Sequence, residues 1–219
     1  MENNLYYPDS KVEVRGLEAK LYDKGLDILT FGTYPFFIKH AIRSMNIKPF
    51  DRILDMGAGT GRNACIMRHF LSKKGEIVGW EIGKEMIEGF KKKCRHAANV
   101  RLEKKRIDVL QPVDKLFDKV FISFVIHGFP HNVREIIVKN AWQQLKNGGE
   151  LFILDYSEFE LERMFPPLRF VFKRAECSYA FDFLKRDFSA FLKEHGFTEV
   201  SSKLFYRGYI RLLKAIKHK

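Results

Sequence analysis

A loop with three closely spaced glycines contains the residues most suited to chemistry. It reads DMGAGTGR, with Asp55 two residues ahead of Gly57, Gly59 and Gly61. Glycine lets a backbone turn sharply and approach a ligand closely, because a Cβ atom would collide or forbid a positive φ. The apolar run before the loop is typical of a strand, and a helix expected from Thr60 would direct its free N–H groups at the same spot. The pattern predicts a ligand-binding loop.

The glycine spacing separates several kinds of nucleotide loop. A dinucleotide fingerprint, G-x-G-x-x-G, needs a sixth-position glycine, and this chain has Arg62 there. A phosphate-binding P-loop needs Gly-Lys-Ser/Thr after the loop, which is absent from the sequence. The spacing fits an acidic residue, one further residue and then G-x-G-x-G. A nicotinamide-dependent oxidoreductase stays open as a weaker alternative.

The elements around this loop alternate between two periodicities. Apolar, β-branched runs predict strands, and segments of helical period predict helices between most of them. The expected strands are 52–56, 76–81, 100–107, 119–124 and 150–156, and the helices are 60–72, 84–97 and 132–146. Such alternation predicts an α/β fold with a parallel sheet covered by helices on both faces. Ligands then bind beyond the carboxyl ends of the strands.

The rest of the chain adds elements at both ends. Two helices are expected at 17–29 and 36–45, and another at 185–195, ended by Gly196. Asn147-Gly148-Gly149 is expected to stop the helix at 132–146. Two adjacent strands surround Arg207-Gly208, and strands this close must pair antiparallel because a parallel return needs a longer connection.

Five motifs follow the strands in order and carry a family resemblance. They are LDMGAGTG, VGWEIGKEM, KRIDVLQP, FDKVFISFVIHGF and LKNGGELFILDYS. In this order they resemble the class I S-adenosylmethionine-dependent methyltransferases. Within that superfamily, LYDKGLDILTFG upstream of the first strand is most similar to the type 11 quinone-biosynthesis C-methyltransferases. The resemblance implies a Rossmann-like, seven-stranded, mostly parallel sheet with an antiparallel strand in a terminal hairpin.

The same resemblance implies S-adenosylmethionine as cofactor and assigns roles to residues. Glu81 would take the ribose hydroxyls, Asp55 would hold the loop and the methionine ammonium, and Asp108 would face the adenine edge. The implied cofactor-binding residues are Tyr22, Asp55, Gly57, Ala58, Gly59, Gly61, Glu81, Ile82, Asp108, Val109, Ser123 and Phe124. Ser123 and Phe124 would line the sulfonium end.

Each of these residues also has an ordinary structural explanation. A glycine cluster after a strand can be a plain tight turn, and an isolated carboxylate is usually solvated. Tyr22 would close over the methionine, although an aromatic residue on an amphipathic helix is more often part of a core. The joint occurrence of the glycines with Glu81, twenty residues after Gly61, favours the cofactor site.

His127 is the candidate catalytic residue. Methyl transfer is an in-line displacement in which the enzyme mainly aligns donor and acceptor, and a base is needed only if the acceptor must lose a proton. His127, His131, Asp155 and Tyr156 all follow strands at the expected crevice, and SFVIHGF resembles the family's SFVLHHL. The alternative is that His127 bonds a backbone carbonyl and only packs.

An aromatic and basic segment follows the fifth strand and is expected to form a helical cap at 157–184. Seven aromatic residues from Phe159 to Phe183 alternate there with arginines and lysines around Pro166-Pro167. This composition suits an apolar pocket lid or a membrane-touching surface, or else a core helix with a solvated basic face. We expect residues 1–48 to be an N-terminal helical extension and 49–219 to be the methyltransferase domain.

Composition limits which partners, metals and locations are expected. The 219 residues, 46% of them hydrophobic, can bury one substantial core, and the formal charge of +12 favours an anionic partner. The three cysteines lack zinc-site spacing, no metal is expected, and a reducing cytoplasm is the predicted location. The N-terminal stretch lacks a signal-peptide pattern, and the longest apolar run is too short to span a membrane.

These observations favour one function and leave others open. The leading hypothesis is methyl transfer to a small apolar or lipid-like acceptor, of the quinone-precursor or phospholipid-headgroup type, with possible peripheral membrane contact. An RNA methyltransferase is the alternative motivated by the charge, but the chain lacks the Asn/Asp-Pro-Pro-Tyr/Phe motif with which base-modifying enzymes stack a flipped base. A module that binds S-adenosylmethionine without transferring its methyl group is another.

Overall fold

The computed structural model describes residues 7, 10, 16 and 32–218, and these contain one seven-stranded sheet. The strands are β1 (Arg52–Met56), β2 (Glu76–Trp80), β3 (Val100–Glu103), β4 (Phe117–Ser123), β5 (Leu145–Tyr156), β6 (Phe197–Phe205) and β7 (Ile210–Lys217). Their order is β3-β2-β1-β4-β5-β7-β6. The strand order reverses at β1, between β2 and β4, which is the point where α/β sheets bind ligands.

Pairing in the sheet is parallel from β3 to β5 and antiparallel at the other edge. β1 pairs in parallel with both β2 and β4, while β7 runs antiparallel between β5 and β6. The predicted mostly parallel sheet with an antiparallel terminal hairpin is confirmed.

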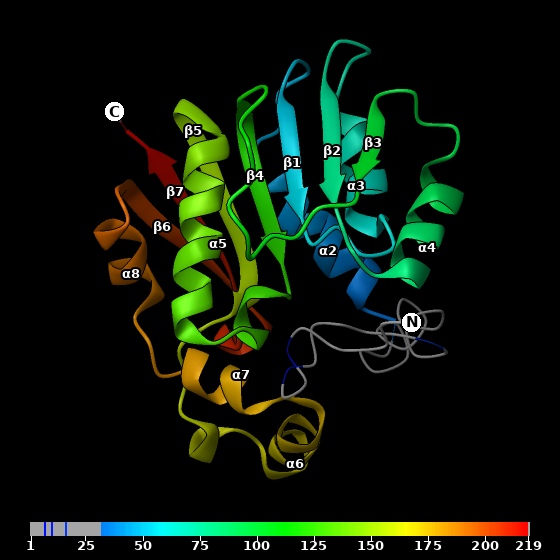
Figure 1. The fold of residues 1–219 in the computed structure, drawn as a ribbon. Helices are drawn as coiled ribbons and strands as arrows, with labels where there is room; N and C mark the ends of the chain where they lie inside the picture. The colour runs from blue at the N-terminus through cyan, green and yellow to red at the C-terminus, as the bar shows by residue number, and fades with distance from the viewer. Residues whose placement is uncertain (1–6, 8–9, 11–15, 17–31, 219) are drawn as a thin grey trace.

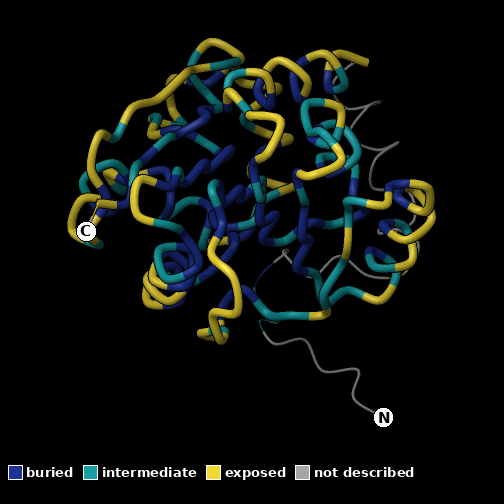
Figure 2. Tube along the Cα trace, turned by 90° about the horizontal axis from the view of Figure 1, so that it is seen from above, coloured by how far each residue is buried: buried dark blue, intermediate teal, exposed yellow. Residues whose placement is uncertain are grey.

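Helices cover both faces of the sheet (Figure 1). The helices are α2 (Tyr34–Arg43), α3 (Arg62–Met67), α4 (Lys84–Cys94), α5 (His131–Gln144), α6 (Pro166–Ala175), α7 (Ser178–Phe183) and α8 (Phe188–Glu194). Alternate residues of each central strand face opposite layers, so Leu54 packs in the cluster with α5 and α8, and Ile53 in the cluster with α2, α3 and α4. The central strands β1, β2, β4 and β5 are largely buried. Buried residues gather at the centre of the molecule, and exposed residues lie around them (Figure 2).

Several predicted boundaries were wrong, each for a local reason. The helix predicted from Thr60 begins at Arg62, because Gly59 and Gly61 have positive φ, and it ends in a 3₁₀ turn at Arg68–Phe70. The strand predicted to reach residue 107 stops at Glu103, because its partner β2 ends at Trp80. Gly148 lies inside the extended β5, where the pairing with β4 is irregular, and the preceding helix stops at Gln144.

The segment at 157–184 is largely helical. A 3₁₀ turn at Leu161–Arg163 precedes α6 and α7, which lie at the carboxyl end of the sheet (Figure 1). The helix predicted at 17–29 lies outside the described residues, as does Tyr22. Among the described helices, none has the length and apolar character needed to cross a bilayer.

Candidate functional site

The glycine loop lies at the carboxyl end of β1, and all three glycines have the backbone conformation that favours glycine. Their φ angles are +78° for Gly57, +53° for Gly59 and +78° for Gly61. A Cβ atom on Gly59 would meet nothing within 4 Å, whereas one on Gly61 would lie 2.8 Å from Phe90. Gly61 therefore serves the packing of α4 on the loop, and Gly59 faces open space. Ala58, between Gly57 and Gly59, is buried.

Glu81 closes this loop from the neighbouring strand end. Its Oε2 accepts a hydrogen bond from the Gly59 backbone N–H at 2.9 Å, and its Oε1 accepts from the N–H groups of Ile82 and Gly83, both at 2.8 Å. The carboxylate is thus held in a fixed orientation beside Gly59. It retains lone pairs that could accept from a ligand.

Asp55, directly before the loop, has an unusual environment. Its side chain is fully buried, and neither carboxylate oxygen has a hydrogen-bond partner among the described residues. Burial, with a smaller contribution from the negative charge of Glu81, raises the pKa of Asp55 from 3.8 to about 7. A buried, ionised carboxylate without partners is costly, so a cation bound beside Asp55 would stabilise its charged form. The ammonium group of S-adenosylmethionine would fit this requirement.

Asp108 lies beyond the third strand and is bound by two residues that the sequence did not suggest. It accepts a hydrogen bond from the Tyr7 hydroxyl at 2.6 Å and pairs with Arg106 at 2.5 Å. Burial would raise the pKa of Asp108, but the hydrogen bonds from Arg106 and Tyr7 hold this pKa below its usual value. Tyr7 lies in an N-terminal stretch without periodicity, so no sequence signal places it here. Val109, the next residue along the chain, is 43% exposed.

Ser123 ends β4 beside the glycine loop, and Phe124 follows it. The Ser123 hydroxyl accepts a hydrogen bond from Asn63 at 2.8 Å, and Asn63 Oδ1 is buried without a partner among the described residues. Phe124 has φ of +50° and packs near Tyr34, Phe37 and Tyr156. A positive φ on a bulky residue marks local strain, which is common at functional sites.

His127 is buried between two carboxylates. Its Nδ1 lies 2.7 Å from Asp155 Oδ1, and its Nε2 lies 3.4 Å from Glu176 Oε2. Burial alone would lower the pKa of His127, but Asp155 and Glu176 together raise it to about 10. The imidazole is therefore a cation at neutral pH. The alternative of a histidine bonded to a backbone carbonyl does not describe the ring contacts found here.

Glu176 joins the helical segment to the sheet. It accepts a hydrogen bond from the Tyr156 hydroxyl at 2.7 Å, in addition to its contact with His127. Arg134, fully buried on α5, donates to the backbone oxygens of His127 and Tyr179 and pairs with Asp182 at 2.8 Å. These polar residues were not predicted, because their partners lie in segments far apart in the sequence.

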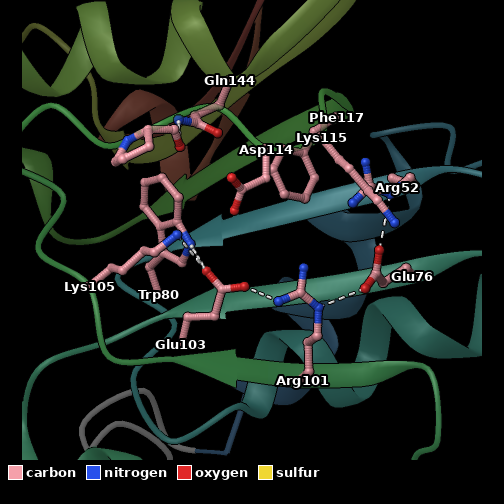
Figure 3. Close-up of a pocket in the computed structure, with 11 residues that line it drawn as sticks. Arg52, Glu76, Trp80, Arg101, Glu103, Lys105, Asp114, Lys115, Phe117 and Gln144 are labelled. Atoms are coloured by element: carbon pink, nitrogen blue, oxygen red, sulfur yellow. Dashed lines mark hydrogen bonds and ion pairs between the residues drawn. The ribbon is translucent and has the colours of Figure 1, made fainter.

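Two cavities lie outside the glycine loop. One, of about 290 Å³, is lined by a row of charged side chains from β1, β2 and β3 (Figure 3). Several of its charges are paired with one another, as in Arg52 with Glu76 at 3.0 Å and Glu76 with Arg101 at 2.7 Å. The second, of about 750 Å³, lies against the segment from Glu158 to Arg163, and its walls combine aromatic side chains, including Phe181 and Tyr209, with charged ones such as Lys185. Of these two cavities, the second is the one next to the helical segment.

Comparison with known proteins identifies the family. The model of the ubiE/COQ5 methyltransferase family matches residues 11–177.

The chain belongs to the ubiE/COQ5 methyltransferase family.

Curated relatives agree with this assignment at modest identity. The chain is 28% identical over 140 residues to the ubiquinone/menaquinone biosynthesis C-methyltransferase UbiE of Wigglesworthia glossinidia brevipalpis, covering 63% of this chain and 55% of the relative. It is 26% identical over 181 residues to the UbiE protein of Photorhabdus laumondii, covering 81% and 68%. The chain thus spans 55% and 68% of the lengths of these two relatives.

Solved structures share the fold. A SAM-dependent methyltransferase from Aquifex aeolicus superposes with a TM-score of 0.62 at 18% identity, covering 82% of this chain and 88% of that one. Human N-acetylserotonin methyltransferase in complex with SAM superposes with a TM-score of 0.66 at 14% identity, covering 92% and 56%. The expected methyltransferase fold and family are confirmed, and with them S-adenosylmethionine as the family's cofactor.

Proposed function

We propose that this ubiE/COQ5 family member transfers the methyl group of S-adenosylmethionine to a carbon atom of a quinone precursor. The observation that carries the proposal is the fully buried Asp55 carboxylate, which has no partner among the described residues and lies at the entry to the glycine loop. The curated relatives are named as ubiquinone and menaquinone biosynthesis C-methyltransferases, which supports the acceptor class.

The proposed cofactor site uses the residues around the loop. Asp55 would pair with the methionine ammonium, and Glu81, already held beside Gly59, would accept from the ribose hydroxyls. Asp108, with Val109 and Ile82, would face the adenine edge. Ser123 and Phe124 would border the sulfonium. When bound, the cofactor supplies a methyl group on a positively charged sulfur, ready for displacement.

The chain's own contribution to the reaction is alignment. Holding donor and acceptor in line can contribute about 7–11 kcal/mol to lowering the barrier. The aromatic rings of Phe124, Tyr156 and Phe172 pack edge-to-face in a chain from the end of β4 to α6, with centroids 6.3 Å and 5.0 Å apart. A flat aromatic acceptor would be oriented by contact with these rings.

His127 acts in this proposal as a positioning residue at the acceptor side. Both of its ring nitrogens face carboxylates and its pKa is raised to about 10, so it does not take a proton from the acceptor at neutral pH. It instead holds Asp155 and Glu176 together, and through Glu176 it fixes the Tyr156 hydroxyl. Tyr156 would then be the group that meets the acceptor.

The proposed acceptor carries an apolar tail, and the segment at 157–184 offers two features that suit it. The cavity of about 750 Å³ has Phe159, Leu161 and Phe181 among its walls. On the outside of α6, Phe170 is 68% exposed, and Phe165, directly before the helix, is 67% exposed. Arg169, Lys173 and Arg174 lie on the same helix as Phe170, an arrangement that favours contact with an anionic membrane surface. We place the enzyme in the cytoplasm, where it reaches a membrane-borne acceptor.

A single labelling experiment tests the proposal against its alternatives. The chain is incubated with methyl-labelled S-adenosylmethionine and, separately, with lipid-extracted, soluble and RNA fractions of cells. The proposal expects label in the quinone-containing lipid fraction, on a product whose methyl group resists mild hydrolysis. Label in RNA would support the alternative that the charge of +12 favours. Cofactor binding without label in any fraction would indicate a binding module instead.

A further inference from the structure

Two cysteines far apart in the sequence meet behind the glycine loop. The Sγ atoms of Cys65, on α3, and Cys94, at the end of α4, are 2.9 Å apart, and neither is in a disulfide. The sequence suggested no pairing of cysteines, because the spacing between them carries no recognisable motif. The contact arises because α3 and α4 pack side by side against the sheet.

The pair is attached directly to the third glycine. The Cys65 backbone N–H donates to the Gly61 carbonyl at 2.9 Å, and the Cys94 thiol lies 3.8 Å from the same oxygen. A Cβ atom on Gly61 would come within 3.2 Å of Cys94 Sγ. A chemical change at these sulfurs would therefore alter side chains that pack directly against Gly61.

The two thiols have different environments. Cys65 is partly exposed, whereas Cys94 is 6% exposed. The hydrogen bond from Cys94 lowers the pKa of Cys65 to about 7 despite partial burial, with help from the positive charges of Arg68 and Lys93. The same contact, together with burial, raises the pKa of Cys94. A reactive thiolate beside a protonated partner is the arrangement of thiols that are oxidised selectively.

We propose that Cys65 and Cys94 form a redox-active pair in which a hydroperoxide oxidises Cys65 and Cys94 then closes a disulfide between α3 and α4. The Cys65 thiolate attacks one oxygen of hydrogen peroxide, the O–O bond breaks, and the other oxygen leaves as hydroxide, giving a sulfenic acid. Cys94 sulfur displaces the sulfenic hydroxyl, forming the S–S bond and releasing water. The hydroxide takes up the proton lost by Cys65. The two sulfurs lose two electrons in total and the peroxide gains them.

The disulfide would lock the conformation that the structure shows. Because the sulfurs are already in contact, the bond needs no movement of the glycine loop. It would tie the helix that follows the loop to the helix that follows Glu81, and a dithiol reductant would release it. Joining two points of the chain restricts the unfolded state, so oxidation should raise the resistance to unfolding.

The test compares the wild-type chain with Cys177→Ser and Cys94→Ser after treatment with hydrogen peroxide. Thiol alkylation followed by peptide mass spectrometry should find the Cys65–Cys94 cross-link in the wild type and in Cys177→Ser, removed again by dithiothreitol. In Cys94→Ser, a dimedone adduct should appear on Cys65. Three alkylated thiols in peroxide-treated wild type, or a disulfide that uses Cys177, would overturn the proposal.

A second measurement tests the proposal in the wild type itself, with two variants as controls. Thermal unfolding of the wild type before and after oxidation should show a midpoint higher by about 5 °C or more in the oxidised protein. Cys177→Ser should show the same rise, and Cys65→Ser none. An unchanged midpoint in the cross-linked wild type would contradict the proposed stabilisation by the disulfide.

Discussion

His127 Nδ1 lies 2.7 Å from Asp155 Oδ1, and both side chains are buried at the carboxyl end of the sheet. Glu176, from the helical segment, approaches the other ring nitrogen at 3.4 Å. One protonated imidazole therefore joins two carboxylates from different parts of the chain. The positive charge on His127 offsets the negative charges of these two carboxylates.

The first prediction concerns this charge. His127→Gln should lower the free energy of unfolding by about 3–5 kcal/mol at pH 6, because it leaves two carboxylates close together without a cation. Since folding raises the pKa of His127 from 6.5 to about 10, its stabilisation is complete below pH 6.5 and is lost as the pH rises through 10. Urea unfolding of both proteins at several pH values checks this. His69→Gln, an exposed histidine, is the control. A difference that is the same at pH 6 and pH 10.5 would contradict the assignment of the charge.

The second prediction concerns Asp55→Asn, which should stabilise the cofactor-free protein but weaken its binding of the cofactor. Folding raises the pKa of Asp55 from 3.8 to about 7, so the wild-type residue costs stability increasingly as the pH rises through this range. Asp55→Asn should therefore stabilise the cofactor-free protein by about 2–4 kcal/mol at pH 8 and have little effect at pH 4.

Cofactor affinity should change in the other direction. Asp55→Asn should weaken the binding of S-adenosylmethionine about tenfold or more, because a charge-assisted hydrogen bond is lost. Calorimetric titration and urea unfolding at pH 8 give both quantities. Asp114→Asn, on an exposed loop, removes the same charge and should alter neither. A destabilised variant with normal affinity would indicate that Asp55 only supports the fold.

The third prediction separates backbone strain from ligand contact. Gly59 and Gly148 both have positive φ, +53° and +74°, and a Cβ atom on either would meet nothing within 4 Å. Alanine at each position should cost about 1–2 kcal/mol of stability from the left-handed conformation alone. Only Gly59→Ala should also weaken cofactor binding, because its Cβ would occupy space left for the ligand. Equal affinities in the two variants would remove Gly59 from the site.

Sequence reasoning found the sheet and the loop because they depend on local patterns. Strand periodicity placed β1, β2 and β4, and the glycine spacing located the turn. The strand at residue 100 was overextended, since its length depends on where its neighbour β2 ends. The partners of Asp108 and His127, namely Tyr7 and Glu176, were missed because their contacts span long sequence separations. The contact between Cys65 and Cys94 was missed for the same reason.

The fourth prediction concerns the exposed aromatic residues of the helical segment. Phe170→Asp should reduce binding to vesicles that contain anionic phospholipid several-fold, because it removes an inserted apolar group and adds a repelled charge. Vesicle co-sedimentation measures the effect. Leu204→Asp, a 60% exposed apolar position on β6, is the matched control and should bind like the wild type. Equal loss in both variants would point to a general charge effect rather than to α6.

The cofactor site is tested most directly by titrating S-adenosylmethionine into the wild-type chain and into Glu81→Ala, with circular dichroism confirming that both are folded. Glu81 is the carboxylate held against Gly59 at 2.9 Å and the proposed partner of the ribose hydroxyls. We predict one-to-one binding to the wild type and an affinity lower by about tenfold or more in Glu81→Ala. An absence of binding to the folded wild type, or equal affinities in the two proteins, would contradict the account.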